Sequence, residues 1–320
     1  MPEHPRVAII VISYNTRPMT LECLRTISDG AAHTSHEVII VDNDSTDGSA
    51  EAIADEFPAY RLIASNENLG FARANNLAAT HTDAQRLLLL NPDTLVDAGA
   101  IDALIEFADA NPDAGIWGGR TRFGDGSPNP TSCWQRPTPW SVLCSALGLA
   151  RIFSHSRLLN SESLGVLPDG TERHVDVVTG CLLLIDRRLW ETLDGFDPAF
   201  FMYGEDADLC LRARMHGARP MVTAAAEIVH YGGQSDRVRP DKIVRLFRAR
   251  RQLYTRHWSA AWQWWADAGP MLNIFLRRLA EAARGSKSDD GSASNDGRVY
   301  AAVWSRRKEW TGRRTDSVVS

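Results

Sequence analysis

Aliphatic runs alternate with helical patterns along the N-terminal part of the chain. The runs are continuous, as in strands buried on both faces of a sheet, and they occupy residues 7–12, 38–41, 61–64 and 86–90. Segments with helical spacing lie at residues 18–27, 50–57 and 70–79, with Ser49 as the predicted N-cap of the second. Because strand–helix–strand units join parallel strands, the pattern predicts an α/β fold with a Rossmann-like, mostly parallel, doubly wound central sheet flanked by helices.

The pattern changes after residue 120. Residues 120–176 are rich in Pro, Gly and Ser and predict irregular loops and short helices. A strand at 181–185, a helix at 188–193, a loop entering a helix that ends at Gly217, and a last strand at 228–231 follow. Residues 240–284 have helical spacing, whereas residues 285–297 are poor in apolar side chains and predict disorder. The predicted divisions are a main domain at 1–235, an amphipathic helical appendage at 236–284, and a flexible linker with a basic tail at 285–320.

Three polar clusters follow predicted strands. They are Ser13-Tyr14-Asn15, Asp42-Asn43-Asp44 and Asn91-Pro92-Asp93. Ligands of open α/β sheets bind at the carboxyl ends of the strands. Three clusters in the same position therefore predict a shared ligand, although one such cluster is ordinary loop chemistry.

Two of these regions have side chains suited to a nucleotide. Asp42 can accept the imino hydrogen of a pyrimidine base, although DNDSTDGS also suits a plain Asx-rich turn that caps a helix. In NENLGFARANN, which contains Asn68, Gly70 allows a tight turn and Arg73 can reach a diphosphate. A polar helix face behind a glycine-containing loop explains that segment equally well.

Asp93 follows a run of four leucines, which fixes its position at a strand end. A carboxylate there can hold a divalent cation against two phosphates, while Asn91 offers only a neutral oxygen. His230 ends the last predicted strand and is a candidate second ligand. The alternatives are an Asn-Pro-Asp turn and a structural histidine.

Glu205, Asp206 and Asp208 cluster at a predicted helix N-terminus. The helix dipole favours their ionised forms, whereas their mutual repulsion opposes ionisation, so one carboxylate can serve as a base near neutral pH. The alternative is an acidic N-terminal turn without chemistry, in which Asp208 pairs with Arg212 at i,i+4.

Composition excludes several classes of protein. The net charge of −5 argues against a general nucleic-acid binder. The five cysteines form no CxxC pair, and several lie in apolar runs, which predicts buried, reduced thiols and favours the cytoplasm. The sequence shows neither a signal-peptide pattern nor a stretch of about 18 apolar residues.

The C-terminal region is basic and rich in tryptophan. Residues 242–258 carry several arginines, Trp258 to Leu279 is amphipathic, and residues 298–312 add Trp304 and Trp310. Such a composition suits peripheral contact with the inner face of the cell membrane. Packing on the main domain, or contact between the subunits of a homo-oligomer, is an equally good interpretation.

Six segments together, in this order, resemble family 2 glycosyltransferases of the GT-A fold. The segments are VISYNT, IIVDNDSTDGS, NENLGFARANN, LLLLNPDT, the run from VTGC to RMHG, and IVHYGGQS. The resemblance covers most of residues 7–233, and NPD with FFMYGEDADLC is most similar to bacterial rhamnosyltransferases of cell-wall or O-antigen synthesis.

The resemblance implies an inverting transfer from a nucleotide-diphosphate sugar, most similar to dTDP-L-rhamnose, onto a glycan or polyprenyl-linked acceptor. It implies Asp42 as the base-binding residue, Asp93 as the ligand of Mg²⁺ or Mn²⁺, Asp206 beside Glu205 as the catalytic base, and His230 near the metal and diphosphate. Asn91 stands where many relatives have the first Asp of the DxD motif, which weakens the metal site. The middle loops are expected to face the acceptor.

Alternatives stay open on the sequence. A UDP sugar, such as UDP-galactofuranose, presents Asp42 with the same base edge. A nucleotidyltransferase or sugar-nucleotide hydrolase would use the same pyrimidine and metal sites, and a non-catalytic binding protein would keep only the fold.

Overall fold

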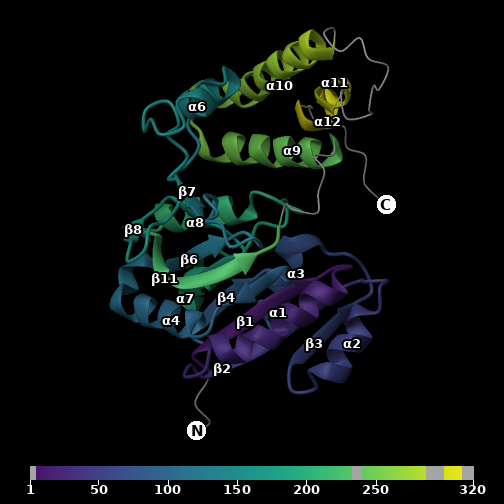
Figure 1. Ribbon diagram of the computed structural model, residues 1–320, viewed down its shortest axis with the longest axis vertical. Coiled ribbons are helices and arrows are strands. Elements are labelled where there is room, and N and C mark those ends of the chain that lie inside the picture. Colours follow the sequence, from purple (N-terminus) through teal and green to yellow (C-terminus); the bar gives the residue numbers. More distant parts are fainter. Residues whose placement is uncertain (1–4, 233–239, 286–298, 312–320) are drawn as a thin grey trace. The chain divides into compact units, whose positions relative to one another are not determined.

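The computed structural model describes residues 5–232, 240–285 and 299–311 (Figure 1). The chain divides into two compact units. Unit 1 comprises residues 1–136 and 163–235, and unit 2 comprises residues 137–162 and 236–320. The segment predicted to be disordered lies outside the described residues, except that Gly285 ends a helix.

Among the described residues of unit 1, nine strands form one sheet. Their order is β3-β2-β1-β4-β10-β6-β11-β5, and β8 pairs with β11. The strands are β1 (Val7–Ser13), β2 (His36–Asn43), β3 (Arg61–Ser65), β4 (Arg86–Leu90), β5 (Thr94–Val96), β6 (Ile116–Arg122), β8 (Glu172–His174), β10 (Leu182–Asp186) and β11 (Met221–His230). A separate pair joins β7 (Cys133–Trp134) to β9 (Val177–Val178).

Helices cover this sheet (Figure 1). They are α1 (Arg17–Gly30), α2 (Ser49–Glu56), α3 (Gly70–Ala79), α4 (Ala100–Ala110), α7 (Arg187–Thr192) and α8 (Glu205–Met215), with the 3₁₀ turn η1 (Pro112–Ala114). Alternate residues of β1, such as Val7, Ile9 and Val11, share a core with α1 and α4. α3 packs against β1 and β2. Because both faces of β1 are covered, its seven residues are all buried, as the continuous aliphatic run predicts.

The sheet is mixed rather than mostly parallel throughout. The pairs β1–β2, β1–β4, β2–β3 and β6–β11 are parallel, while β10–β4, β10–β6, β11–β5 and β11–β8 are antiparallel. The predicted strand at 181–185 thus runs against β4. The strand–helix rhythm on which the prediction depends ends at β4, so it could not reveal the direction of the later strands.

Two predicted helix ends are wrong. Gly48, at φ 76°, is the N-cap of α2, and Ser49 is its first residue. Asp47 explains this, because its Oδ1 accepts hydrogen bonds from both the N–H and the hydroxyl of Ser49. The helix predicted to end at Gly217 stops at Met215, with His216 as its C-cap.

Unit 2 is helical. It contains α5 (Pro139–Ala146), α6 (Leu149–Ile152), α9 (Pro240–His257), the 3₁₀ turn η2 (Ala260–Trp262), α10 (Gln263–Gly285), α11 (Val299–Ser305) and α12 (Arg307–Thr311). Its small core consists of Ile243, Val244, Ile274, Val303 and Trp310. No helix among the described residues is both long and apolar enough to cross a membrane.

The tryptophans of unit 2 differ in their surroundings. Trp258 and Trp265 donate their indole N–H groups to the carbonyls of Pro137 and Pro139, at 3.1 and 3.0 Å. Trp310 is buried. These three side chains therefore stabilise unit 2 itself, whereas Trp262 and Trp264 are exposed.

Candidate functional site

The polar clusters lie at one edge of the sheet. β1 and β2 are parallel with Ser13 opposite Asp42, and β1 and β4 are parallel with Val11 opposite Leu90. Asn91 to Asp93 continue directly from β4. The register therefore brings the three clusters to neighbouring strand ends, which is the position predicted for a shared ligand.

Asp42 is held rigidly with one oxygen free. The side chain is 3% exposed, and its Oδ2 accepts the N–H of Ser45 at 3.0 Å. Its Oδ1 is shielded and has no hydrogen-bond partner among the described residues. A buried carboxylate oxygen without a donor is costly unless a ligand supplies one. This oxygen is therefore the strongest indication of a base-binding position.

The first cluster supports the loop after β2. Asn15 adopts a left-handed conformation, φ 51°, and its Oδ1 accepts the N–H of Thr46 at 2.8 Å. Ser13 is fully buried and its hydroxyl lies 3.1 Å from that of Thr20. Tyr14 is exposed. Asn15 is also exposed, so a ligand can reach the side chains of Tyr14 and Asn15 but not that of Ser13.

Asn43, at the end of β2, and Asn68, in the loop before α3, are hydrogen-bonded to each other. Asn43 donates from Nδ2 to Asn68 Oδ1 at 3.0 Å and accepts the N–H of Leu69 at 2.9 Å. Asn68 Oδ1 also accepts the N–H of Gly70 at 2.9 Å. This network shapes the entry to α3, so both asparagines act on the site through the loop that they hold.

Gly70 begins α3 in a left-handed conformation, φ 74°. A Cβ there would lie 2.6 Å from the carbonyl oxygen of Phe201, so both conformation and packing require glycine. Arg73, one turn further, is exposed. The predicted tight turn is present, and the reach of Arg73 to a diphosphate stays a prediction.

Asp93 and His230 meet because β5 pairs with β11. Thr94 is opposite His230, and the N–H of Tyr231 donates to the carbonyl of Asp93 at 2.9 Å. His230 Nε2 lies 3.2 Å from Asp93 Oδ1, and the two side chains keep 18% and 23% of their surface exposed. The sequence predicts this pair, although the residues are far apart along the chain.

Gly232 closes one side of this pair. A Cβ at this position would lie 2.5 Å from His230 Nε2 and 3.1 Å from Asp93 Oδ2. Any side chain there would push the imidazole away from the carboxylate. Gly233, the next residue, lies outside the described residues.

The charge state of His230 depends on its neighbours. Burial lowers its pKa, but hydrogen bonds with Asp93 and Cys181 outweigh this effect and raise the pKa to about 10. Without a cation, the imidazole is therefore protonated and forms an ion pair with Asp93.

A short chain of contacts connects this pair to the acidic helix. The N–H of Asn91 donates to the carbonyl of Cys181 at 3.2 Å. The N–H of Gly180, one residue earlier, donates to Asp206 Oδ2 at 3.0 Å. The start of β10 thus links the loop that carries Asp93 to the first turn of α8.

Glu205 and Asp206 form a coupled acidic pair. Burial raises the pKa of Asp206, against the lowering effect of hydrogen bonds from the N–H groups of Gly180 and Ala207. Burial and the charge of Asp206 raise the pKa of Glu205 to about 8. Glu205 Oε2 is shielded and has no hydrogen-bond partner among the described residues. The pair therefore holds a proton more firmly than ordinary carboxyls do.

Asp208 has a structural role. It is fully buried and its Oδ2 lies 2.7 Å from Arg212 Nε, as the i,i+4 spacing predicts. Arg212 also donates to the carbonyls of Leu193 and Gly195 at 2.7 and 2.8 Å. The ion pair thus holds the turn before the 197–204 loop, and Glu205 and Asp206 are the remaining carboxylates of this helix.

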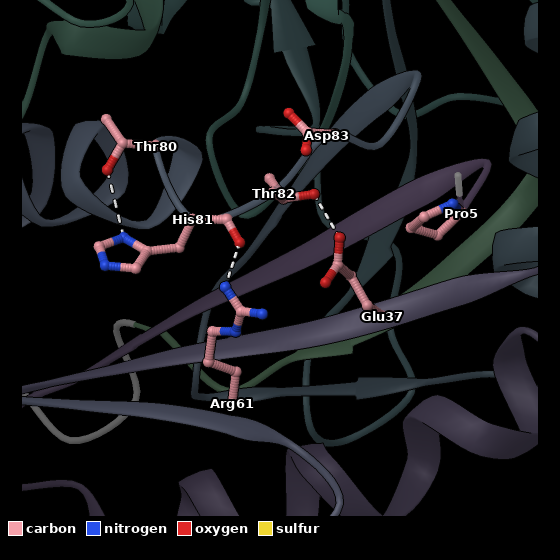
Figure 2. Close-up of a pocket in the computed structure, with 7 residues that line it drawn as sticks. All are labelled: Pro5, Glu37, Arg61, Thr80, His81, Thr82 and Asp83. Atoms are coloured by element: carbon pink, nitrogen blue, oxygen red, sulfur yellow. Dashed lines mark hydrogen bonds between the residues drawn. The ribbon is translucent and has the colours of Figure 1, made fainter. Parts of the chain in front are cut away.

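Two open pockets lie on unit 1. One, of about 440 Å³, lies at the carboxyl edge beside the 45–48 loop and the start of α2. The other, of about 470 Å³, lies at the opposite edge (Figure 2) and is lined by Pro5, Glu37, Arg61, Thr80, His81, Thr82 and Asp83. There Glu37 accepts the hydroxyl of Thr82, and Arg61 donates to the carbonyl of His81. These polar groups satisfy each other, and the pocket contains none of the predicted site residues.

The sequence analysis missed the supporting roles of two glycines. Gly180 orients Asp206, and an added Cβ there would lie 3.7 Å from both Asp206 Oδ2 and the Phe71 ring. Gly232 makes room for the Asp93–His230 pair. The sequence marks these positions only by a glycine directly before a predicted strand, in VTGC, and by a glycine after His-Tyr. Neither pattern shows which side chain an added Cβ would meet.

The sequence is similar to those of known glycosyltransferases. Residues 8–161 match the family described as "Glycosyl transferase family 2". The chain is 29% identical over 238 residues to the N-acetylglucosaminyl-diphospho-decaprenol L-rhamnosyltransferase of Mycobacterium tuberculosis, covering 71% of this chain and 76% of that protein. It is 24% identical to the rhamnosyltransferase WbbL of Escherichia coli, covering 72% of this chain and 85% of that protein.

Solved structures share the fold. A mannosyltransferase of Pyrobaculum calidifontis, in complex with GDP-Man and Mn²⁺, aligns with a TM-score of 0.56 at 20% identity, covering 96% of this chain and 86% of that one. The TarS protein of S. aureus, residues 1–349 in complex with UDP, aligns with a TM-score of 0.51 at 14% identity, covering 95% and 82%.

Proposed function

The chain carries a glycosyltransferase family 2 domain and is a glycosyltransferase, and on that basis we propose that it inverts a sugar from a nucleoside diphosphate onto an acceptor hydroxyl. The proposed donor is dTDP-L-rhamnose, and the proposed acceptor is a lipid-linked or glycan intermediate of cell-wall or surface-polysaccharide synthesis. The named rhamnosyltransferases support this choice. The observation that carries the proposal is the alignment of Asp42, Asp93 and Asp206 along one sheet edge.

Asp42 supports a pyrimidine donor. Its Oδ1 needs a donor group, and N3–H of thymine or uracil supplies one at the edge of the base. The same hydrogen bond forms with dTDP and UDP sugars. Asp42 therefore selects a base that carries an imino N–H, which excludes adenine and cytosine, and it does not distinguish thymine from uracil.

The Asp93–His230 pair fits a divalent cation. The pair offers one carboxylate and one imidazole, and Gly232 leaves both side chains accessible. No group of three or more His, Cys, Asp or Glu that could hold a metal occurs among the described residues. Mg²⁺ and Mn²⁺ commonly use one or two protein ligands together with substrate phosphates, so two are sufficient. When bound, the cation would neutralise charge on the leaving diphosphate.

Asp206 is the proposed general base. Two backbone N–H groups fix its carboxylate, and burial raises its pKa, which makes the ionised form a stronger base. It accepts the proton of the acceptor hydroxyl while that oxygen bonds to the anomeric carbon. The bond from that carbon to the diphosphate oxygen breaks on the opposite face, so the configuration inverts without a covalent intermediate.

The proposed location is the cytoplasm, at the inner face of the cell membrane. All five cysteines are buried and free, which suits a reducing compartment. A polyprenyl-linked acceptor would bring the reaction to the membrane surface.

A donor screen tests the proposal. Release of nucleoside diphosphate is measured with dTDP-, UDP- and GDP-sugars, each with and without a polyprenyl-diphosphate-linked acceptor. We expect release from dTDP-L-rhamnose that depends on the acceptor. Rapid stoichiometric release without acceptor would instead identify a sugar-nucleotide hydrolase, and a preference for GDP-sugars would refute the proposed pyrimidine donor.

A further inference from the structure

Unit 2 exposes large apolar side chains on the segment that precedes its long helices. We call Trp140, Leu147, Ile152, Phe153 and Leu158 the α5–α6 apolar surface. Ile152 and Leu158 are 71% and 67% exposed, and the other three are about half exposed. A group of this kind on a folded domain marks a contact with something outside it.

The packing of α5 explains why this surface faces outward. α5 buries Val142 and Ala146, which lie on the side of the helix opposite Trp140. A Cβ on Gly269 of α10 would lie 2.6 Å from Val142, and Asn273 of α10 donates to the carbonyl of Ser145 at 3.0 Å. Since α10 already occupies that face, the remaining apolar side chains have no partner within the helix pair.

Hydrogen bonds hold the α5–α6 apolar surface in place. The indole N–H of Trp140 donates to the carbonyl of Leu158 at 2.8 Å, which ties the start of α5 to the end of the segment. A capping box at Thr138 and Ser141 fixes the first turn of α5. The apolar side chains are therefore presented by an ordered segment.

The start of α10 extends this surface. Trp265 donates to the carbonyl of Pro139, the residue before Trp140, and its ring meets that of Trp264 edge-on at 5.3 Å. Trp264 is 61% exposed, and Trp262 is about half exposed. Two further indoles thus stand next to the first turn of α5.

Charge decides which kind of partner fits. Residues 137–161 contain no Asp or Glu, whereas Arg151 and Arg157 are both exposed. Glu162, the residue after this stretch, accepts the hydroxyl of Ser141, and Asp267 of α10 pairs with Arg251. Exposed tryptophans and aliphatic side chains beside unpaired positive charge match the interface of an anionic bilayer.

We propose that the α5–α6 apolar surface, together with Trp262 and Trp264, docks unit 2 on a membrane that contains anionic lipids. The proposal deepens the proposed function, because docking would bring the enzyme to a lipid-linked acceptor. It differs from the sequence-based expectation, since Trp258, Trp265 and Trp310 are used inside unit 2 and the 137–162 segment takes their place.

Vesicle sedimentation of the full chain tests this inference. The probes are vesicles of phosphatidylcholine alone and of equal parts phosphatidylcholine and phosphatidylglycerol. We expect binding to the mixed vesicles. Ile152→Ser combined with Leu158→Ser should weaken it at least about tenfold, and Arg151→Gln or Arg157→Gln about fivefold each. Met215→Ser is the matched control, since Met215 is 79% exposed on unit 1 and should have no effect.

Three results would overturn the inference. They are absence of binding to the mixed vesicles, equal loss with Met215→Ser, and a stable dimer in solution that the Ile152 and Leu158 changes dissociate without any vesicle binding. The measurement needs neither donor nor acceptor. Failure of sugar transfer would therefore leave vesicle binding intact, and failure of vesicle binding would leave transfer to a water-soluble acceptor intact.

Discussion

Two ionisable pairs stand at the carboxyl edge of the sheet, and their surroundings differ. Asp93 faces an imidazole and keeps 23% of its side-chain surface exposed. Asp206 sits beside a second carboxyl, Glu205, and burial raises the pKa values of both. The first pair can balance the charge of a cation and a diphosphate, whereas the second resists carrying negative charge.

The difference shows how one residue type serves two purposes. An aspartate beside a positive neighbour stays ionised and binds charge, and a buried aspartate beside another acid is a stronger base when ionised. Removing Asp206 should therefore slow the chemical step and leave donor binding intact, and disturbing Asp93 should weaken cation-dependent binding.

Asp206→Asn should have the largest effect. The amide keeps the size of the side chain but cannot accept the acceptor proton, so the rate of transfer should fall by about a thousandfold. Rates are measured at saturating donor and acceptor. Turnover within a few-fold of the wild-type rate would remove Asp206 from the role of base.

Gly232→Ala should have the second-largest effect on transfer. The added methyl would lie 2.5 Å from His230 Nε2, so the imidazole must move away from Asp93. We expect a fall of about a hundredfold in transfer, of the size seen when groups around a metal ligand are disturbed, and a higher cation concentration for half-maximal rate. An unchanged cation requirement would show that this pair does not hold the metal.

Asp42→Asn should weaken binding of the sugar donor rather than slow the chemical step. Loss of a charged acceptor for the base N–H costs about 1.5 kcal/mol, or roughly tenfold in donor KM. Asp44→Asn is the matched control, because Asp44 is exposed and Asn tolerates its left-handed φ of 67°. A similar change in KM for both variants would contradict base recognition by Asp42.

Glu205→Gln should have the smallest effect, seen as a change in how stability varies with pH. The pKa of Glu205 rises from 4.5 to about 8 in the folded protein, so the unfolded chain loses this proton first. Stability from this group is present at low pH and is lost as pH rises across that range, with a slope of at most about 1.4 kcal/mol per pH unit. Urea unfolding across the range should show a shallower decline for the glutamine variant. A decline equal to that of the wild type would show that Glu205 does not cause this loss of stability with rising pH.

The fold was predictable where the pattern is local. Continuous aliphatic runs identify β1, β2 and β4, and the predicted helix at 70–79 is α3. β6 was not found, because its sequence IWGGRTR contains Gly118 and Gly119. A Cβ on these residues would lie 2.3 Å from Val178 and 2.2 Å from the carbonyl oxygen of Ala226. Such glycines reflect contacts between distant segments, which periodicity cannot show.

The site residues also divide into those that the local sequence pattern predicts and those that depend on contacts between distant segments. Asp42 lies in the last two residues of β2 and Asp93 comes three residues after β4, so their shared edge follows from the sequence. The contact of Asp93 with His230 requires the pairing of β5 with β11, and the support of Asp206 requires Gly180 at the start of β10. These contacts depend on antiparallel strands that the strand–helix rhythm does not reveal. The hydrogen bond between Asn43 and Asn68 was likewise not predictable. An asparagine in a loop can bind a ligand or hydrogen-bond within the loop equally well.

Calorimetric titration of dTDP tests the central distinction most directly. It compares the wild type, Asp93→Asn and Asp206→Asn, each in Mn²⁺ and in EDTA. The different roles of the two pairs predict that Asp206→Asn binds as tightly as the wild type and gains the same from Mn²⁺, while Asp93→Asn loses that gain. Loss of the Mn²⁺ effect in Asp206→Asn, or its full retention in Asp93→Asn, would contradict the division of roles between the two pairs.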